Sequence, residues 1–390
     1  MKRPLLLPLI PLYAAGLALR ELRLTRGWEP IRRLRHPVIS IGNLSTGGAG
    51  KTPLVIALTQ ALKHRGFAVD VLSRGYGRSA TSAARVDPNG TAEEFGDEPL
   101  LIARQAGAPV FVARQRYDAG LLAEAEFPYP AQAAPAPPQV AARSVGRGFP
   151  RDSAPESTGA KPTAEDLDRA VGRRFIPGNS AAGYVGALAP EVRSLTPAPA
   201  QPQVVHILDD GFQHRQLHRD IDILLLNRAD WHDRLLPAGN LREALRAATR
   251  ASIIAIPATE PDLESQLHVW GWKGPIWRLN RRLEIPSINA QVLAFCGIAR
   301  PEQFFAGLTQ SALEVTAHYA FRDHHRYTVR DLDRLANQAR AAGATTLLTT
   351  EKDEVRLQGL KSPLPIATVR LRTEIENEPA ALDWIAAQLR

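Results

Sequence analysis

A glycine-rich stretch followed by lysine and threonine is the part of this sequence best suited to bind phosphate. Glycines allow backbone N–H groups to approach an anion, and the positive end of a following helix dipole adds to the attraction. The Lys51 ammonium can reach the outer phosphates of a nucleotide, and the Thr52 hydroxyl can ligate Mg²⁺. The stretch therefore predicts a P-loop that binds a nucleoside triphosphate. Its residues are Ser45, Thr46, Gly47, Gly48, Ala49, Gly50, Lys51 and Thr52.

This stretch departs from the usual P-loop pattern, G-x-x-x-x-G-K-[ST], at its first position, where the chain has Ser45. A chance glycine-rich turn is the alternative interpretation. The context favours a P-loop, because the apolar run 37–41 predicts a strand before it and the run 53–63 predicts a helix after it. Pro53 suits the first turn of that helix.

Pairs of carboxylates stand at two other places in the chain. Asp209 and Asp210 follow the apolar run 204–208, and a carboxylate in such a position can hold Mg²⁺ opposite the P-loop threonine. An Asx turn at the end of a strand is the alternative. Asp97 and Glu98 supply two more carboxylates, although acids before a proline are also typical of a helix start.

Arginines and histidines add further candidates. Arg74 and Arg78 flank two glycines after the run 67–72. Two guanidinium groups on flexible backbone suit the recognition of a phosphate or a sugar phosphate, and a solvated turn is the alternative. In the second half of the chain, the adjacent His324 and His325 form a candidate proton relay.

The elements that must position these residues alternate between strands and helices. This alternation predicts an α/β fold in which a parallel sheet of the P-loop NTPase type has helices on both faces. The ligand is expected at the carboxyl ends of the strands. After the strand at 109–112 the alternation breaks. Strands are predicted at 37–41, 67–72, 109–112, 204–208, 221–226 and 251–256, and helices at 53–63 and 99–106.

The chain divides into three predicted parts. Residues 1–30 form an N-terminal membrane-associated helix, and residues 31–284 form the P-loop core. Residues 285–390 form a smaller C-terminal α/β domain, with strands at 292–295, 345–348 and 366–369 and a helix at 328–342. Residues 128–202 interrupt the core and hold 13 of the 31 prolines and 16 alanines, which predicts a disordered or loosely ordered insertion.

Most of the positive charge lies at the N-terminus. Residues 1–36 hold eight Lys or Arg against two Glu, a net +6 of the total +8. The rest of the chain is nearly neutral, which argues against a nucleic-acid-binding face. A single cysteine, Cys296, excludes an intramolecular disulfide and favours a reducing compartment, and it is predicted to be a buried small hydrophobe.

The basic residues bracket an apolar stretch, 5–19, that Pro8 and Pro11 interrupt. A cleaved signal peptide fits its length and charged start. A transmembrane helix needs about 20 apolar residues, and this run is shorter. An uncleaved anchor fits a short apolar segment whose arginines contact anionic headgroups, and a buried amphipathic helix is a further alternative. Because ATP is cytoplasmic, the P-loop favours an anchor at the cytoplasmic face of a membrane.

The ordered set of motifs resembles the tetraacyldisaccharide 4'-kinase family, the lipid A 4'-kinases of Gram-negative bacteria. The resemblance covers nearly the whole chain apart from the insertion, and the joint order of the motifs is specific. The motifs are Asn43 with the glycine-rich loop, followed by residues 73–78, 96–99, 209–214, 236–239, 241–243, 295–304, 323–325 and 350–353.

The resemblance implies transfer of the γ-phosphoryl group of ATP to the 4'-hydroxyl of a tetraacylated glucosamine disaccharide 1-phosphate. The implied partners are this lipid A precursor and the cytoplasmic surface of the bacterial inner membrane, with no nucleic acid. Asp97 is implied as the base and His324 as its orienting partner. Contacts to ATP and Mg²⁺ are implied for Lys51, Thr52, Glu98, Asp209 and Asp210, and contacts to the headgroup or the phosphates for Arg74, Arg78, Arg242 and Glu243.

Two features depart from the family pattern. The insertion is long, and Asn240 stands where the family usually has a proline, so the local turn is expected to differ. The main alternative is a membrane-associated P-loop ATPase that switches a protein partner. ATPases of that class with a deviant loop carry a lysine where this chain has Thr46, which counts against this alternative.

Overall fold

The computed structural model describes residues 3–126, 202–311 and 313–389. The predicted insertion, 128–202, lies outside the described residues except for Pro202. The described residues belong to one compact unit.

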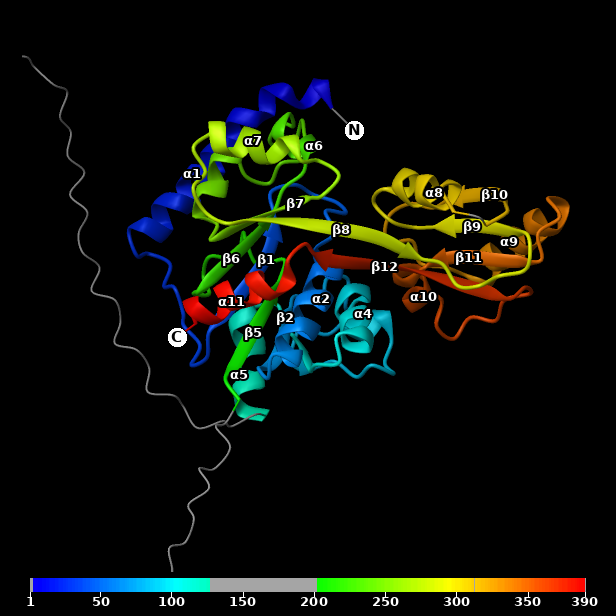
Figure 1. Ribbon diagram of the computed structural model, residues 1–390, viewed down its shortest axis with the longest axis horizontal. Helices are drawn as coiled ribbons and strands as arrows, with labels where there is room; N and C mark the ends of the chain where they lie inside the picture. Colours follow the sequence, from blue (N-terminus) through cyan, green and yellow to red (C-terminus); the bar gives the residue numbers. More distant parts are fainter. Residues whose placement is uncertain (1–2, 127–201, 312, 390) are drawn as a thin grey trace, which may run out of the picture. The chain divides into compact units, whose positions relative to one another are not determined.

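A mixed sheet of twelve strands organises the described residues, in the order β10-β9-β11-β12-β8-β7-β6-β1-β5-β2-β4-β3 (Figure 1). The first eight strands along the chain are β1 (Val38–Asn43), β2 (Ala68–Ser73), β3 (Ala84–Arg85), β4 (Val110–Val112), β5 (Val204–Asp209), β6 (Ile221–Leu225), β7 (Ile253–Pro257) and β8 (Ile276–Glu284). The last four are β9 (Val292–Cys296), β10 (Val315–Ala320), β11 (Thr346–Thr350) and β12 (Ile366–Ile375).

The predicted parallel strands are confirmed around β1. This strand pairs in parallel with β5 and β6, and Ile39 lies opposite Ile207 on one side and Ile221 on the other. All six residues of β1 are buried, as are all residues of β5 and β6. Burial on both faces explains why these strands appear in the sequence as continuous apolar runs rather than as alternating patterns.

Two long strands, β8 and β12, connect two groups of strands. The first group comprises β7, β6, β1, β5, β2, β4 and β3, and the second comprises β9, β10 and β11. The first half of β12 pairs with β11, and its second half pairs antiparallel with β8, where Leu371 lies opposite Leu283. Figure 1 shows β8 and β12 extending side by side between the groups. The sequence did not predict β8, whose residues mix apolar side chains with arginines and other polar residues. Residue 285 falls between β8 and β9, and a separate C-terminal domain stays a prediction.

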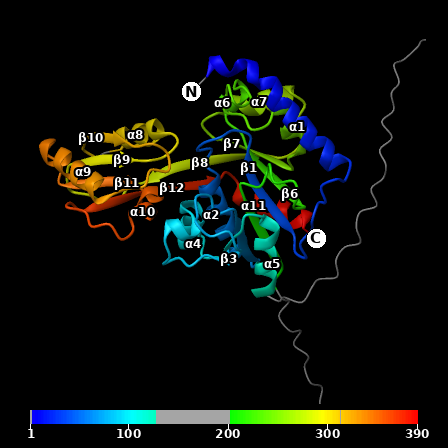
Figure 2. The same cartoon turned by 180° about the vertical axis from the view of Figure 1, so that it is seen from behind.

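Helices cover both faces of the sheet, as predicted (Figure 2). Two neighbouring residues of β6 face opposite sides of the sheet. Ile223 packs in the hydrophobic cluster that includes the helices at 51–64, 97–105 and 378–388. Leu224 packs in the cluster that includes the helical segments at 245–250 and 262–269. The helices are α1 (Ile10–Thr25), α2 (Lys51–His64), α3 (Ala92–Phe95), α4 (Asp97–Gln105), α5 (Arg116–Glu126), α6 (Arg228–Trp231), α7 (Asp262–Val269), α8 (Pro301–Thr309), α9 (Val329–Ala341), α10 (Glu351–Leu357) and α11 (Glu378–Gln388), with 3₁₀ segments η1 (Pro4–Leu9) and η2 (Leu245–Arg250).

Two expectations about helices need correction. The alternation does not stop at β4, because α5 follows it and buries Ala119 and Ala123 against the sheet. The apolar N-terminal run is also not too short to span a membrane. Helix η1 continues into α1, and the 22 residues from Pro4 to Thr25 are long and apolar enough to cross one. The prolines lie within its first turns, where they do not end the helix.

Candidate functional site

The predicted phosphate-binding residues form the connection between β1 and α2. Helix α2 begins at Lys51, so its N-terminus points its free N–H groups toward the loop. Gly50 precedes the helix with a φ of 82°, in the left-handed region that favours glycine. The Thr46 N–H donates to the Asn240 carbonyl at 2.8 Å, which ties the loop to the turn that contains Asn240.

Ser45 is buried in a polar network, which explains why a side chain is tolerated at this position. The Asn43 amide donates to the Ser45 carbonyl at 2.7 Å and lies 3.3 Å from its hydroxyl. The oxygen of the same amide accepts hydrogen bonds from Lys51 at 3.0 Å and from Arg242 at 2.6 Å. Asn43 therefore orients the lysine of the loop.

Asp210 is held by cations. Arg242 donates to both of its carboxylate oxygens, at 2.8 and 2.9 Å, and Lys51 Nζ lies 3.5 Å away. Burial raises the pKa of Asp210, but Lys51 and Arg242 outweigh burial and hold it below its usual range. Arg242, predicted as a substrate contact, thus has its guanidinium engaged by Asp210 and Asn43.

Asp209 lies in a different environment. Its Oδ2 accepts a hydrogen bond from the Ser73 hydroxyl at 2.9 Å, whereas its buried Oδ1 has no partner among the described residues. Burial and the charges of Glu98 and Asp210 raise its pKa to about 7. An unpartnered buried carboxylate oxygen is costly unless a cation binds there.

The oxygen ligands at this end of the sheet fit Mg²⁺ bound together with a nucleotide. Mg²⁺ in such sites takes most of its ligands from phosphates and water, so one or two protein oxygens suffice. Asp209 Oδ1 and the buried hydroxyl of Thr52 fit this role. Glu98 forms an ion pair with Lys352 instead. Within residues 3–126, 202–311 and 313–389, no three His, Cys, Asp or Glu side chains are grouped to hold a metal ion by themselves.

The structure brings together Asp97 and His324, which are far apart in the sequence. Asp97 begins α4 and is 6% exposed, and its Oδ2 lies 3.0 Å from His324 Nδ1. Gly96 before it has a φ of 90°, and a Cβ there would lie 2.9 Å from the Tyr76 carbonyl oxygen. Only glycine therefore suits the turn that places Asp97 at the helix N-terminus.

Arg356 of α10 completes this group, and the sequence analysis missed it. Its Nε donates to Asp97 Oδ2 at 2.9 Å, and its Nη1 donates to the Gly297 carbonyl at 2.7 Å and to Asp353 at 3.0 Å. Asp353 is fully buried. Arg356 follows Asp353 by three residues, which is the spacing of neighbours on one face of a helix. This acid–base spacing is the sequence signal that could have indicated Arg356.

The charge of Asp97 is stabilised by its neighbours. Burial raises its pKa, but the hydrogen bond from His324 and the charges of Arg356 and Lys352 outweigh burial and hold the pKa below its usual range. The hydrogen bond to Asp97 in turn raises the pKa of His324. Asp97 is therefore an ionised acceptor at neutral pH.

A cavity of about 700 Å³ connects these groups. The P-loop, Asp97, Asp209 and Asp210 line it from the first group of strands, and His324 and Lys352 line it from the second. A further part of its wall is apolar and suits a nucleobase. This part comprises Leu283, Ile298, Phe304, Val369 and Leu371.

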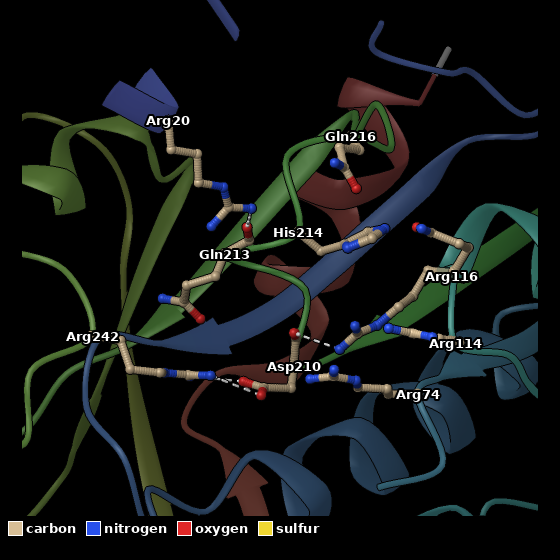
Figure 3. A pocket seen from close by; sticks show the side chains of 10 residues that line it. Arg20, Arg74, Arg114, Arg116, Asp210, Gln213, His214, Gln216 and Arg242 are labelled. Atoms are coloured by element: carbon tan, nitrogen blue, oxygen red, sulfur yellow. Dashed lines mark hydrogen bonds and ion pairs between the residues drawn. The ribbon is translucent and has the colours of Figure 1, made fainter. Parts of the chain in front are cut away.

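A second, strongly basic pocket of about 290 Å³ shares part of this wall (Figure 3). Asp210 is its only carboxylate, and Arg74 and Arg114 have no carboxylate partner among the described residues. Burial and the charges of nearby arginines, Arg116 first, lower the pKa of His214 to about 3. The pocket therefore suits an anion. Its arginines are Arg20, Arg74, Arg114, Arg116 and Arg242.

Two predicted substrate residues have other contacts. The Arg78 guanidinium donates to the Ser82 carbonyl at 2.6 Å and lies 3.4 Å from the Val112 carbonyl oxygen. Glu243 pairs with Arg250 at 2.7 Å. Neither residue lines the two cavities described above.

Known proteins resemble this chain over nearly its whole length. The profile of the family described as tetraacyldisaccharide-1-P 4'-kinase matches residues 2–132 and 192–390. The chain is 36% identical to a tetraacyldisaccharide 4'-kinase of Koribacter versatilis, with 97% of each protein covered. It is 33% identical to the one of Geobacter sulfurreducens, with 96% of this chain and 91% of the relative covered.

A solved structure is similar as well. It is the crystal structure of the "apo" form of LpxK from Aquifex aeolicus in complex with ATP. The TM-score is 0.65 and the sequence identity 28%, with 99% of this chain and 98% of that chain covered.

Proposed function

The chain belongs to the tetraacyldisaccharide-1-P 4'-kinase family, and we propose that it transfers the γ-phosphoryl group of ATP to the 4'-hydroxyl of a tetraacylated glucosamine disaccharide 1-phosphate in lipid A biosynthesis. One observation carries this proposal. A P-loop and an ionised buried aspartate line one cavity, and a basic pocket shares part of the wall of that cavity. A phosphate donor, an acceptor hydroxyl and an anionic headgroup can therefore meet there.

The nucleotide site consists of the P-loop and the apolar wall of the larger cavity. Backbone N–H groups of the loop and Lys51 hold the outer phosphates, and Thr52 with Asp209 Oδ1 would hold Mg²⁺. When bound, this ion neutralises charge that develops on the β- and γ-phosphates. Asp210 keeps Lys51 and Arg242 in place.

Asp97 receives the proton of the acceptor hydroxyl. The 4'-oxygen forms a bond to the γ-phosphorus as the bond to the ADP oxygen breaks, and the hydroxyl proton passes to Asp97. A carboxylate with a lowered pKa is a weak base, so it takes the proton late, when the attacking oxygen has become acidic. Positioning and charge neutralisation dominate in such reactions, and His324 and Arg356 supply the positioning.

The basic pocket suits the phosphate of the acceptor. Arg74 and Arg114 lack carboxylate partners among the described residues, and guanidinium groups bind phosphate through paired hydrogen bonds. Arg78 and Glu243 have other contacts, and we do not include them in this site.

The N-terminal helix supports a location at the membrane. Arg20 of α1 lines the basic pocket and donates to the Gln213 carbonyl at 2.5 Å, and the Tyr13 hydroxyl donates to the Arg242 carbonyl at 2.9 Å. A lipid headgroup in the pocket would thus lie beside the apolar helix. We infer that α1 binds the cytoplasmic face of the bacterial inner membrane, where ATP is available.

The test is phosphoryl transfer by the purified full-length protein from labelled ATP to a tetraacyldisaccharide 1-phosphate in detergent micelles. We expect label on the lipid, and Asp97→Ala lowers turnover by a factor of about 100 to 10,000 while ATP binding persists. The control is Asp333→Ala, which changes an exposed aspartate on α9. Unchanged turnover of Asp97→Ala would remove this residue from the chemistry. Partner-stimulated ATP hydrolysis without labelled lipid would favour the ATPase alternative.

A further inference from the structure

Arg281, on the strand that connects the two groups of strands, contacts the P-loop. Its Nη2 donates to the Ala49 carbonyl at 2.7 Å. The same nitrogen lies 2.5 Å from the position that a Cβ on Gly50 would occupy. Gly50 is thus required both for its positive φ and for the approach of this guanidinium. The contact brings a second cation, besides Lys51, to the phosphate-binding loop.

The charge of Glu260 acts on Arg281, but the two groups are not paired. Within the described residues Arg281 has no ion pair, although it lines the cavity and is exposed to it. Arg278 on the same strand pairs with Glu264 at 2.7 Å, and the neighbouring Arg282 pairs with Glu374 at 3.0 Å. Arg281 therefore differs from its neighbours in having a guanidinium that remains available to an anion.

Arg300 is a second cation of this kind. It precedes α8, lines the same cavity and forms no ion pair among the described residues. Its charge acts on Asp230, but the two groups are not paired. Desolvation lowers the pKa of Arg281, and the charge of Arg300 lowers it further. Two like charges beside a phosphate loop favour an anion between them.

We propose that Arg281 and Arg300 bind the β- and γ-phosphates of ATP together with Lys51, so that residues outside the P-loop complete the triphosphate site. This inference rests on the ATP site of the proposed function. A guanidinium has five N–H donors in a planar fork. Arg281 can therefore keep its bond to Ala49 while its other donors bind phosphate oxygens. Arg300 comes from the second group of strands, so the triphosphate would contact both groups.

The experiment is calorimetric titration of the full-length protein in detergent with ATP and, separately, with AMP. Arg281→Ala and Arg300→Ala each raise the Kd for ATP about tenfold, because each removes a charge-assisted contact. The Kd for AMP changes less than about twofold, because AMP lacks the β- and γ-phosphates. Arg278→Ala is the matched control on the same strand, and it leaves both constants unchanged.

The outcomes separate a phosphate contact from a structural contact. The proposal is overturned if both alanine variants bind ATP with wild-type affinity. It is also overturned if the variants lose ATP and AMP affinity equally and the Tm of the nucleotide-free protein falls, because the contact is then structural. If Arg281→Ala does not fold, Arg281→Lys, which keeps the charge, is expected to lose less ATP affinity than Arg300→Ala. A Lys variant that loses as much would count against Arg281. If the wild-type protein transfers no phosphate to the lipid acceptor, the binding results still stand, and only the proposed kinase function is contradicted.

Discussion

Asp209 and Asp210 are adjacent in the sequence, but their carboxylates have different neighbours. Arg242 and Lys51 surround Asp210, so its charge is already compensated by the protein. Asp209 has one hydroxyl donor, Ser73, and one buried oxygen without a partner among the described residues. The two residues also differ in backbone conformation, because Asp209 ends the strand β5 and Asp210 has a φ of 49°, in the left-handed region. Asp209 is therefore the better candidate to contact Mg²⁺.

A substitution at Asp209 tests this assignment. Asp209→Asn is expected to lower turnover by a factor of about 100 or more, because the loss of metal positioning is worth several kcal/mol. The Mg²⁺ concentration for half-maximal activity should rise, and EDTA should abolish the activity of the wild type. The measurement is the initial rate against Mg²⁺ concentration, with Asp333→Asn as the exposed control. An unchanged Mg²⁺ requirement in Asp209→Asn would contradict the assignment.

At the scale of elements, a buried charged group joins β5, β2 and α5. His206 of β5 is 1% exposed, and its Nδ1 lies 2.8 Å from Asp70 Oδ1 on β2. Its Nε2 lies 3.6 Å from Glu124 of α5, whose carboxylate also accepts the His36 N–H at 3.2 Å. Burial lowers the pKa of His206, but Asp70 and Glu124 outweigh burial and raise it to about 9. These contacts fasten the ends of α5 and β5, between which the segment 127–201 lies in the sequence.

This group makes folding stability depend on pH. The pKa of His206 is about 9 in the folded state and about 6.5 in an unfolded chain. Its stabilising contribution is therefore complete below pH ~6.5 and is lost as the pH rises through ~9. The loss is roughly 3 kcal/mol by this difference. The charged and titratable groups that face the His206 ring, or the carboxylates paired with it, are Asp70, Glu124, Arg35 and His36.

The measurement is the free energy of unfolding from denaturant titrations between pH 6 and pH 9.5. The wild type should lose stability across this range, and His206→Gln should be less stable at pH 6 and show a flatter dependence. Equal slopes for the two proteins would mean that His206 does not carry the effect.

For the molecule as a whole, exposed apolar side chains are concentrated at the N-terminus. Among the described residues, eight of the twelve large apolar side chains that are exposed belong to residues 5–31, and Leu5 is 93% and Leu12 74% exposed. The helix is nevertheless fixed to the catalytic body, since Tyr13 and Arg20 form hydrogen bonds with it and Glu21 pairs with Arg215. An apolar surface of this kind beside arginines suits a bilayer with anionic headgroups.

Substitutions on this surface separate membrane binding from catalysis. A triple variant with Leu5→Ser, Leu12→Ser and Leu19→Ser is expected to bind anionic liposomes at least 100-fold less tightly, because each buried leucine contributes about 1.5 to 3 kcal/mol. Its turnover on micellar substrate should be retained, since Tyr13 and Arg20 are unchanged. Sedimentation with liposomes is the measurement, and Leu121→Ser on α5 is the exposed control. Undiminished sedimentation of the triple variant would refute the anchor.

Local patterns in the sequence determined much of this description. The P-loop, most strands of the sheet and the helices α2, α4 and α9 were predictable because glycine conformation, apolar runs and helical periodicity act over a few residues. The motif order likewise indicated the family, which the comparisons confirm. Strand β8 was not predictable, because its antiparallel partner β12 follows about ninety residues later and four of its nine residues are exposed.

The tertiary structure decided which side chains meet. Arg356 with Asp97, Arg242 with Asp210 and Arg281 with the P-loop are contacts between residues far apart in the chain. Nothing in the local sequence distinguishes Arg281 from Arg282, although one faces the phosphate loop and the other an acidic partner. A side chain's type sets what it can bind, but the free energy of a charge depends on the neighbours that folding places around it.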